Sequence, residues 1–201
     1  FIGGPAANAE SDIRLGSYRA VLAEHGLAPD EQLVVHGTFM PESGALAVRT
    51  LTKRFGQRLE QLDAIVAAND NMAIGAIGEL GNLGIAVPDR LAVAGFDDIE
   101  EARLNEPSLT TSRQPLDRIG TEAVRRLLQG RGDGEPIDQR ISTEMVVRQS
   151  CGCSALGLSP RPSLPSKQRF QVALMGQRQR IEAQLGRAAC GRFSAAGRGW
   201  E

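Results

Sequence analysis

The sequence predicts an α/β protein built on a doubly wound parallel sheet, and three observations lead to this prediction. Signals for strands and helices alternate along the chain. Two of the expected strands, 64–68 and 91–95, are continuous apolar runs, as in parallel strands that are buried on both faces. Repeated strand–helix–strand units with right-handed crossovers place helices on both faces of such a sheet.

The first part of the chain is expected to contain two strands and two helices. Residues 1–4 end a strand, and residues 33–35 form a second short strand. Residues 11–25 predict a helix, because apolar residues recur there at helical spacing and Gly26 follows. Residues 41–55 predict another helix, which a Pro-Glu-Ser sequence opens.

The middle of the chain repeats this alternation. The helix expected at 71–83 lies between the apolar strands 64–68 and 91–95. Its three glycines predict close packing against a neighbouring element; they are Gly75, Gly78 and Gly81.

The last third changes character. Residues 116–128 predict an amphipathic helix, and residues 141–147 a final strand. Residues 154–166 are rich in Ser, Pro and Gly and are expected to be a linker. Two interpretations stay open for 168–189, a helix leading to an output domain or part of a disordered tail, and the tail is favoured for 190–201.

Composition and charge limit the function classes. The 201 residues suffice for one ordinary domain. Residues 1–159 contain 15 Lys and Arg against 22 Asp and Glu, which disfavours binding to a phosphate backbone, whereas 160–201 are basic. The three cysteines form no disulfide framework and indicate a reducing compartment. No segment is as long as a transmembrane helix.

Polar and aromatic residues follow each expected strand in the first hundred residues. In an open parallel sheet, ligands bind beyond the carboxyl ends of the strands, so these side chains should converge. They are Asn8, Asp12, Arg14, Thr38, Phe39, Asn69, Asp70, Asn71, Phe96, Asp97 and Asp98.

This set suits a neutral polyol or a similar polar metabolite. Asp97 and Asn69 offer oxygens that can bridge adjacent hydroxyls, and Arg14 offers a planar fork of donors. Phe39 offers a flat apolar face to the C–H side of a ring. Singly, each has a simpler interpretation as a cap, turn, exposed charge or core residue, and helix capping is favoured for Asp70. Jointly, a binding site explains them better.

Patterns for catalysis and for metal binding are weak. His25 and His36 have no Cys or acid at metal-ligand spacing, and no nucleophile elbow, Walker loop or dinucleotide fingerprint occurs. The adjacent Asp97 and Asp98 could hold Mg²⁺, but no neighbouring Lys or phosphate loop supports this. Cys151-Gly152-Cys153 could be half of a redox or metal site, although without a second pair a structural role is favoured. The sequence therefore predicts a binding protein without a cofactor, not an enzyme.

Four segments resemble, in order and spacing, motifs of the LacI/GalR family of regulators and its sugar-binding relatives. They are FIGGP at 1–5 with Arg14 and Tyr18 after it, ANDNMAIGA at 68–76, LAVAGFDD at 91–98 and PSLTTSRQP at 107–115. The family's counterparts are FIGGP with R-x-x-GY, AND-x-MA-x-G, VSVVGFDD and PPLTTVRQP. Ser17 stands where the family usually has Gly.

The resemblance implies a periplasmic-binding-protein-like fold of type I, in which ligand lies between two α/β lobes joined by three crossing strands. It makes residues 1–153 an effector-binding domain, consisting mostly of the C-terminal lobe at 1–105 and 139–150. Residues 115–129 would be a helix of the N-terminal lobe, and 154–201 a linker and tail. The rest of that lobe and a DNA-binding head are expected to precede this N-terminally truncated sequence.

By matched position, the resemblance assigns effector binding to Arg14, Asn69 and Asp97, an aromatic contact to Phe39, and the edge of the cleft to Gln114. The implied effector is a sugar or related polar metabolite. The implied protein is a cytoplasmic homodimer that contacts DNA only through its head. Effector binding would close the lobes and control the output.

Three other functions are alternatives to a transcriptional regulator. The ending at 148–153 and the 48 residues after it resemble sensor hybrids with a diguanylate cyclase or kinase output. A periplasmic sugar-binding transport protein is a second alternative. An enzyme such as a sugar-phosphate isomerase is disfavoured, because it needs a tuned general base in the cleft and no His follows the predicted strands except beside Thr38.

Overall fold

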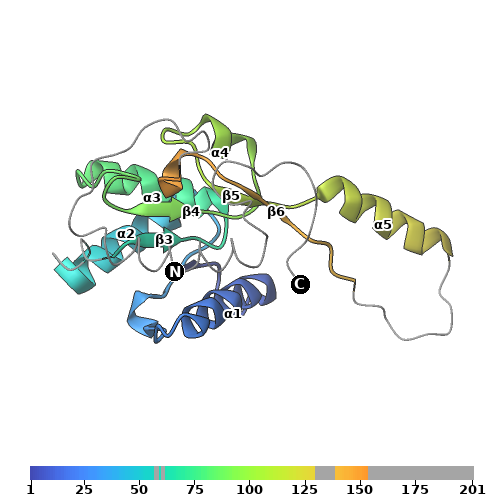
Figure 1. Cartoon of the computed structure of the whole chain (residues 1–201), viewed down its shortest axis with the longest axis horizontal. Coiled ribbons are helices and arrows are strands. Elements are labelled where there is room, and N and C mark those ends of the chain that lie inside the picture. The colour runs from blue at the N-terminus through green and yellow to red at the C-terminus, as the bar shows by residue number, and fades with distance from the viewer. Residues whose placement is uncertain (57–58, 60–61, 130–138, 154–201) are drawn as a thin grey trace.

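The computed structural model describes residues 1–56, 59, 62–129 and 139–153. The helices are α1 (Ala9–Glu24), η1 (Glu31–Leu33), α2 (Pro41–Phe55), α3 (Asp70–Asn82), α4 (Glu100–Leu104), α5 (Leu116–Gln129) and η3 (Gln149–Cys151). The strands are β1 (Ile2–Gly3), β2 (Val35–His36), β3 (Ala64–Val66), β4 (Ala92–Ala94), β5 (Thr111–Arg113) and β6 (Glu144–Val146). Figure 1 shows a body that contains α1 to α4, from which α5 extends away.

Parallel pairing joins the first five strands in the order β2-β1-β3-β4-β5. β1 pairs with β2, and β3 pairs with β4. Parallel bridges connect these pairs, between Ile2 and Ala67, Ala94 and Thr110, and Asp97 and Arg113. β6 pairs antiparallel with β5. The predicted α/β fold with a parallel sheet is therefore confirmed.

Local hydrogen bonds explain where the elements begin and end. Asn8 caps α1 by accepting a hydrogen bond from the amide of Ser11, and Gly26 follows this helix with a φ of 72°. α2 begins at Pro41 and ends at Phe55, as predicted. The strand predicted at 33–35 is wrong at its start: Asp30 accepts a hydrogen bond from the amide of Gln32 and caps a 3₁₀ turn, so β2 begins only at Val35.

Helices α2 and α3 pack closely through two glycines. A Cβ at Gly44 would lie 2.0 Å from the carbonyl oxygen of Met72, and one at Gly75 would lie 1.8 Å from that of Pro41. The two backbones therefore approach too closely for any side chain at these positions. The prediction of close packing is confirmed for Gly75 but is wrong for Gly78 and Gly81, where a Cβ would meet no described residue within 4 Å.

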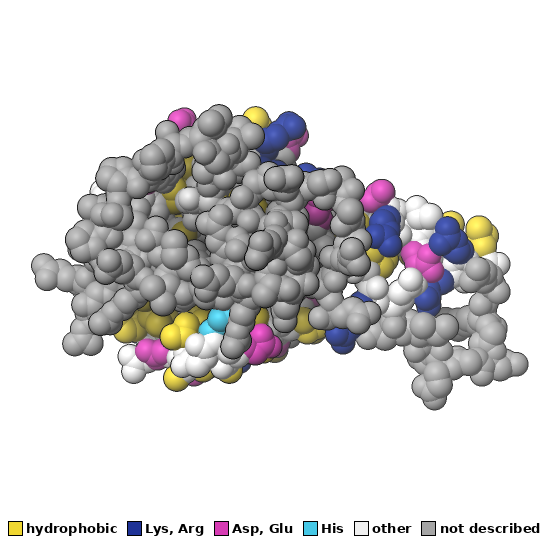
Figure 2. Space-filling view, in the orientation of Figure 1, with side chains coloured by type: hydrophobic (Ala, Val, Ile, Leu, Met, Phe, Trp, Pro, Cys, Tyr) yellow, Lys and Arg dark blue, Asp and Glu magenta, His cyan; other side chains and the backbone are white. Residues whose placement is uncertain are grey.

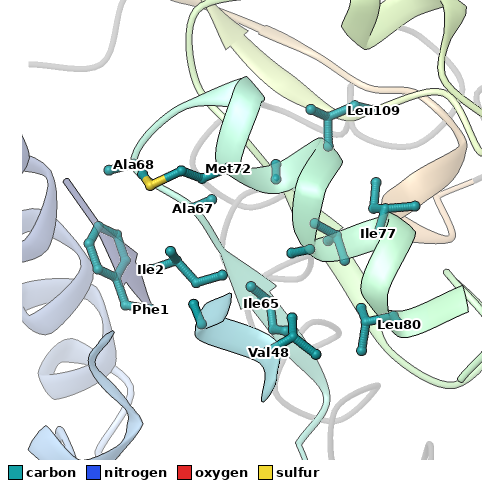
Figure 3. Packing of buried hydrophobic residues seen from close by; sticks show 14 of the residues in the cluster. Phe1, Ile2, Val48, Ile65, Ala67, Ala68, Met72, Ile77, Leu80 and Leu109 are labelled. Carbon is teal, nitrogen blue, oxygen red and sulfur yellow. The ribbon is translucent and has the colours of Figure 1, made fainter. Parts of the chain in front are cut away.

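An aliphatic core fills the space between the sheet and these helices. Figure 3 shows side chains of β1, α2, β3 and α3 meeting in one cluster, which Leu109 joins from the segment before β5. The largest fully buried hydrophobic members are Ile2, Met72, Leu80, Leu91 and Leu109. Burying an aliphatic side chain of this size contributes about 1.5–3 kcal/mol, so this cluster is the main source of stability.

Helix α5 does not share in this core. It extends from the body beside β5 and β6 (Figure 1), and hydrophobic side chains are visible among charged ones at its end (Figure 2). Leu116, Val124, Leu127 and Leu128 are 67%, 55%, 80% and 83% exposed. The apolar face that the sequence predicted for 116–128 exists, and described residues leave it largely uncovered.

Some predictions concern residues outside the described part of the chain. These are the linker at 154–166, the helix at 168–189 and the tail at 190–201. The short helix α4 was not predicted, because five residues are too few for a periodic pattern. None of the described helices combines the length and the apolar character needed to span a membrane.

Candidate functional site

Residues that follow five strands lie along the carboxyl edge of the sheet. Gly4 follows β1, Phe39 follows β2, Asn69 follows β3, Asp97 follows β4 and Gln114 follows β5. Arg14 reaches the same edge from α1, because its Nη1 donates a hydrogen bond of 2.9 Å to the carbonyl of Ala68. We call Arg14, Phe39, Asn69, Asp97 and Gln114 the strand-end face.

The side-chain amide of Asn69 makes hydrogen bonds through both its oxygen and its nitrogen. Its Oδ1 accepts a 3.0 Å hydrogen bond from the amide of Met72 and so caps α3. Its Nδ2 donates a 2.9 Å hydrogen bond to the carbonyl of Phe39. Asn69 is therefore a helix cap that also fixes the loop after β2, and any ligand contact would add to these roles.

Phe39 has an unusual backbone conformation that turns its ring towards Gly4. Its φ is 65°, in the left-handed region that residues other than glycine rarely adopt. A Cβ at Gly4 would lie 2.2 Å from Cζ of the Phe39 ring. Glycine at position 4 therefore permits the ring to lie against β1, and the half-buried Phe39 is held at the edge of the sheet.

Arg14 is held by stacking as well as by hydrogen bonding. Its guanidinium carbon lies 3.9 Å from the centroid of the Phe96 ring, which is a cation–π contact. Nη2 also lies 3.3 Å from the exposed carboxylate of Glu10. The sequence placed Phe96 among the strand-end residues but did not identify it as the platform that orients Arg14, because that contact joins two distant elements.

Asp97 and Gln114 form a direct pair across two strand ends. Nε2 of Gln114 donates a 2.6 Å hydrogen bond to Oδ1 of Asp97. Burial raises the pKa of Asp97, while the hydrogen bond from Gln114 and the charge of Arg14 oppose that rise. Asp97 has a φ of 119°, and its amide donates to the carbonyl of Ser112, so the backbone of β5 fixes this loop. Its Oδ2 accepts no hydrogen bond from the described residues.

Asp70 has a different role from the predicted one. It is fully buried, with Oδ1 accepting a 2.6 Å hydrogen bond from the Thr111 hydroxyl and Oδ2 a 3.0 Å bond from the amide of Ile99. Burial raises the pKa of Asp70 despite these hydrogen bonds. The capping role favoured for Asp70 is wrong, since Asn69 caps α3 and Asp70 ties that helix to β5 and to the loop after β4.

Asp98 is also structural. Its carboxylate lies 2.6 Å from Nε of Arg113 and 2.5 Å from Nη2 of Arg148. Burial alone would raise the pKa of Asp98, but the two guanidinium groups outweigh it and hold the pKa below its usual value. Asp98 therefore joins β5 to the segment after β6. Within the described ranges, no group of three or more potential metal ligands occurs.

The strand-end face presents donor, acceptor and apolar groups side by side. Asp97 offers an uncommitted acceptor oxygen, Arg14 offers donors, and the rings of Phe39 and Phe96 offer apolar faces. Three of the other residues predicted for this edge have local hydrogen bonds or are exposed. Asn8 caps α1, the amide of Thr38 donates a hydrogen bond to the Ser43 hydroxyl, and Asp12 is exposed to solvent. The structure thus brings the five predicted residues to one edge of the sheet, with hydrogen bonds between Asn69 and Phe39 and between Gln114 and Asp97.

The chain is similar to known proteins over most of its described length. The profile of the periplasmic binding protein-like domain matches residues 1–151. The chain is 38% identical over 153 residues to the HTH-type transcriptional regulator AscG of Escherichia coli K12, and 37% identical over 152 residues to CelR of Thermobifida fusca. These matches cover 75% and 74% of this chain but 44% and 43% of the relatives, so the chain spans less than half of their length.

Solved structures share the fold. The crystal structure of the E. coli repressor AscG matches with a TM-score of 0.65 and 37% identity, over 75% of this chain and 54% of that one. The CelR–cellobiose complex matches with a TM-score of 0.68 and 36% identity, over 74% and 45%. The lac repressor dimer bound to operator and the anti-inducer ONPF matches with a TM-score of 0.63 and 26% identity, over 75% and 44%.

Proposed function

The chain belongs to the periplasmic binding protein-like family, as an effector domain of the LacI type of transcriptional regulator, and from this premise we propose that its strand-end face binds a sugar. Its α/β fold is that of these regulators, and the relatives are transcriptional regulators, not enzymes. The assignment of sugar binding to particular residues rests on the Asp97–Gln114 hydrogen bond and on the stacking of Arg14 on Phe96.

One observation supports this site most strongly. The Asp97–Gln114 pair lies at the same edge of the sheet as Arg14, which is stacked on Phe96. An uncommitted carboxylate oxygen beside a guanidinium can accept from one hydroxyl and donate to its neighbour, which is the pattern of a vicinal diol. The Phe39 ring adds an apolar surface for the C–H face of a pyranose. Cellobiose, the sugar in the CelR complex, is the first probe to use.

A second lobe is part of the proposal. The exposed apolar face of α5 needs a partner, and the chain spans less than half of its relatives' length. We propose that residues 1–105 and 139–150 form the C-terminal lobe, and that 115–129 belong to an N-terminal lobe. Ligand held between the lobes would favour their closure, and closure would reach the output domain.

The proposed output is regulation of transcription. The lac repressor structure is a dimer on operator DNA, and the relatives AscG and CelR are HTH-type regulators. By this analogy, the intact protein is a cytoplasmic homodimer that contacts DNA through a head domain. The acidic balance of residues 1–159 supports a body that does not itself bind DNA.

Calorimetric titration of the full-length protein with cellobiose, glucose and galactose tests the site. Asp97→Ala should weaken binding of the sugar that binds best by roughly 10- to 150-fold, because a charge-assisted hydrogen bond is worth about 1.5–3 kcal/mol. Glu24→Ala is the matched control, since Glu24 is an exposed carboxylate at the far end of the helix that contains Arg14.

Two results would contradict the proposal. Equal affinities of the wild type and the Asp97→Ala variant would remove the strand-end face from the site. Absence of binding by every neutral sugar, in a protein that does bind a charged metabolite, would reject the sugar class while retaining an effector function.

A further inference from the structure

Two thiols lie together at the end of the described lobe, away from the strand-end face. Cys151 is the last residue of η3, and Gly152 follows with a φ of 72° and a ψ of 4°. This left-handed turn brings the backbone of Cys153 back, so that its amide donates a 3.2 Å hydrogen bond to Sγ of Cys151. Both cysteines are half-buried, and Gly152 between them is exposed. The pair is therefore partly exposed.

The residue before this pair is fixed firmly to the sheet. Ser150 is fully buried; its hydroxyl donates a 2.6 Å hydrogen bond to the carbonyl of Val93 and accepts a 2.8 Å bond from the amide of Thr110. Its own amide donates to the carbonyl of Ser108. These bonds give Ser150 a structural role. They do not explain the two neighbouring thiols, for which the sequence alone favoured a structural role.

The surroundings of Cys151 favour its thiolate. A hydrogen bond from the side chain of Cys153 is the largest of the influences that lower the pKa of Cys151 to about 6, and burial opposes it. The Thr110 side chain and the Cys153 amide add to the lowering. A thiolate that is accessible and next to a second thiol has the features of cysteines that react with oxidants.

We propose that Cys151 and Cys153 form a redox-sensitive dithiol, in which a hydroperoxide oxidises Cys151 and Cys153 resolves the product to an intramolecular disulfide. A zinc site is not supported, because structural zinc takes four ligands and the described residues contain no cluster of three or more candidates. The proposal concerns a modification site and does not depend on sugar binding.

The chemistry proceeds in two balanced steps. The Cys151 thiolate attacks the terminal oxygen of the hydroperoxide, an S–O bond forms, the O–O bond breaks, and the departing alkoxide takes a proton from water. Cys153 then attacks the sulfur of the sulfenic acid, an S–S bond forms, the S–O bond breaks, and the departing hydroxide takes the thiol proton. Two thiols and one hydroperoxide thus give one disulfide, one alcohol and one water.

The first experiment identifies the attacking and the resolving sulfur. The 201-residue chain with Cys190→Ser is treated with hydrogen peroxide and analysed by mass spectrometry of the peptide containing residues 151–153. We expect loss of two hydrogens in that peptide. Adding Cys153→Ser should replace the disulfide with a sulfenic acid on Cys151 that dimedone traps, whereas adding Cys151→Ser should leave Cys153 without dimedone label. Circular dichroism confirms that the variants share one fold.

The second experiment measures the pH dependence of alkylation by iodoacetamide. In the Cys190→Ser chain, alkylation of Cys151 should be half-maximal near pH 6 when folded and near the ordinary thiol value of about 8.5 in urea. Cys153→Ala should shift the folded midpoint upwards. Equal midpoints in the folded and unfolded chains would overturn the proposal. So would equal dimedone labelling of either cysteine when the other is absent, or peroxide products that contain only intermolecular disulfides.

Discussion

Replacing both Leu127 and Leu128 with Gln should lower the stability of this chain by only about 0.6–1.2 kcal/mol in total. The two side chains are 80% and 83% exposed, so each realises about one fifth of the roughly 1.5–3 kcal/mol that full burial provides. The expected loss is therefore about 0.3–0.6 kcal/mol per residue, and Gln is nearly as good a helix former as Leu. Leu80→Ala, at a fully buried site of α3, should instead cost about 2–5 kcal/mol.

Urea unfolding followed by circular dichroism compares the two variants with the wild type. Analytical ultracentrifugation of the same samples measures self-association, which the double Gln variant should reduce because it removes exposed apolar surface. Hydrogen exchange should show weak protection over 116–128 in the monomer and strong protection in α3.

The reasoning about α5 fails under either of two outcomes. A loss above about 2 kcal/mol in the double Gln variant would mean that Leu127 and Leu128 are buried within this chain. Uniformly strong protection across 116–128 in a monomer would mean the same for the whole helix. Either result would also remove the argument that this helix belongs to a second lobe.

Three further predictions concern other parts of the chain. Ser150→Ala should lower the free energy of unfolding in urea by roughly 2–5 kcal/mol, because it leaves the Thr110 amide and the Val93 carbonyl without their buried partner. Ser17→Ala, at an exposed position, should lower it by less than about 0.5 kcal/mol, and similar losses in the two variants would contradict the prediction. Asp98→Asn should lower the free energy of unfolding at neutral pH. Because the pKa of Asp98 is lower in the folded than in the unfolded chain, the gap in stability between wild type and variant should shrink as pH falls below about 4. A gap that stays constant across pH would contradict the prediction. The 201-residue chain should give no sequence-specific shift in a DNA gel assay, since residues 1–159 are acidic and contain no helix-turn-helix signature; a specific shift would refute this.

The order of helices and strands could be predicted from the sequence because it depends on local pattern. Apolar runs gave the two central strands. The Pro-Glu-Ser sequence gave the start of α2, the helix whose predicted and observed bounds coincide. The prediction was wrong at the start of 33–35, where the Asp30 side chain accepts a hydrogen bond from the amide of Gln32 and caps a 3₁₀ turn. It was also wrong at Gly78 and Gly81, because spacing alone does not show which face of α3 meets α2.

The division of roles between Asn69 and Asp70 could not be predicted. Both residue types cap helices well, so local sequence does not separate them. What separates them is the position of Thr111, which lies 41 residues further along the chain and donates to the buried carboxylate of Asp70. The stacking of Arg14 on Phe96 depends equally on a long-range contact. Sequence therefore located the edge of the sheet where these residues meet, and tertiary structure assigned the individual roles.

Three carboxylates surround the loop after β4, and their partners decide which one is available to a ligand. Asp70 is buried between β5 and the Ile99 amide, and Asp98 is paired with two guanidinium groups, so both stabilise the loop. Of the three, Asp97 accepts a hydrogen bond from a side chain of the strand-end face, that of Gln114, and its second oxygen accepts none from the described residues. The carbonyl of Gln114 in turn accepts a hydrogen bond from the amide of Leu116, the first residue of α5. A ligand that competes for Asp97 would therefore act, through Gln114, on the start of the helix that projects from the lobe.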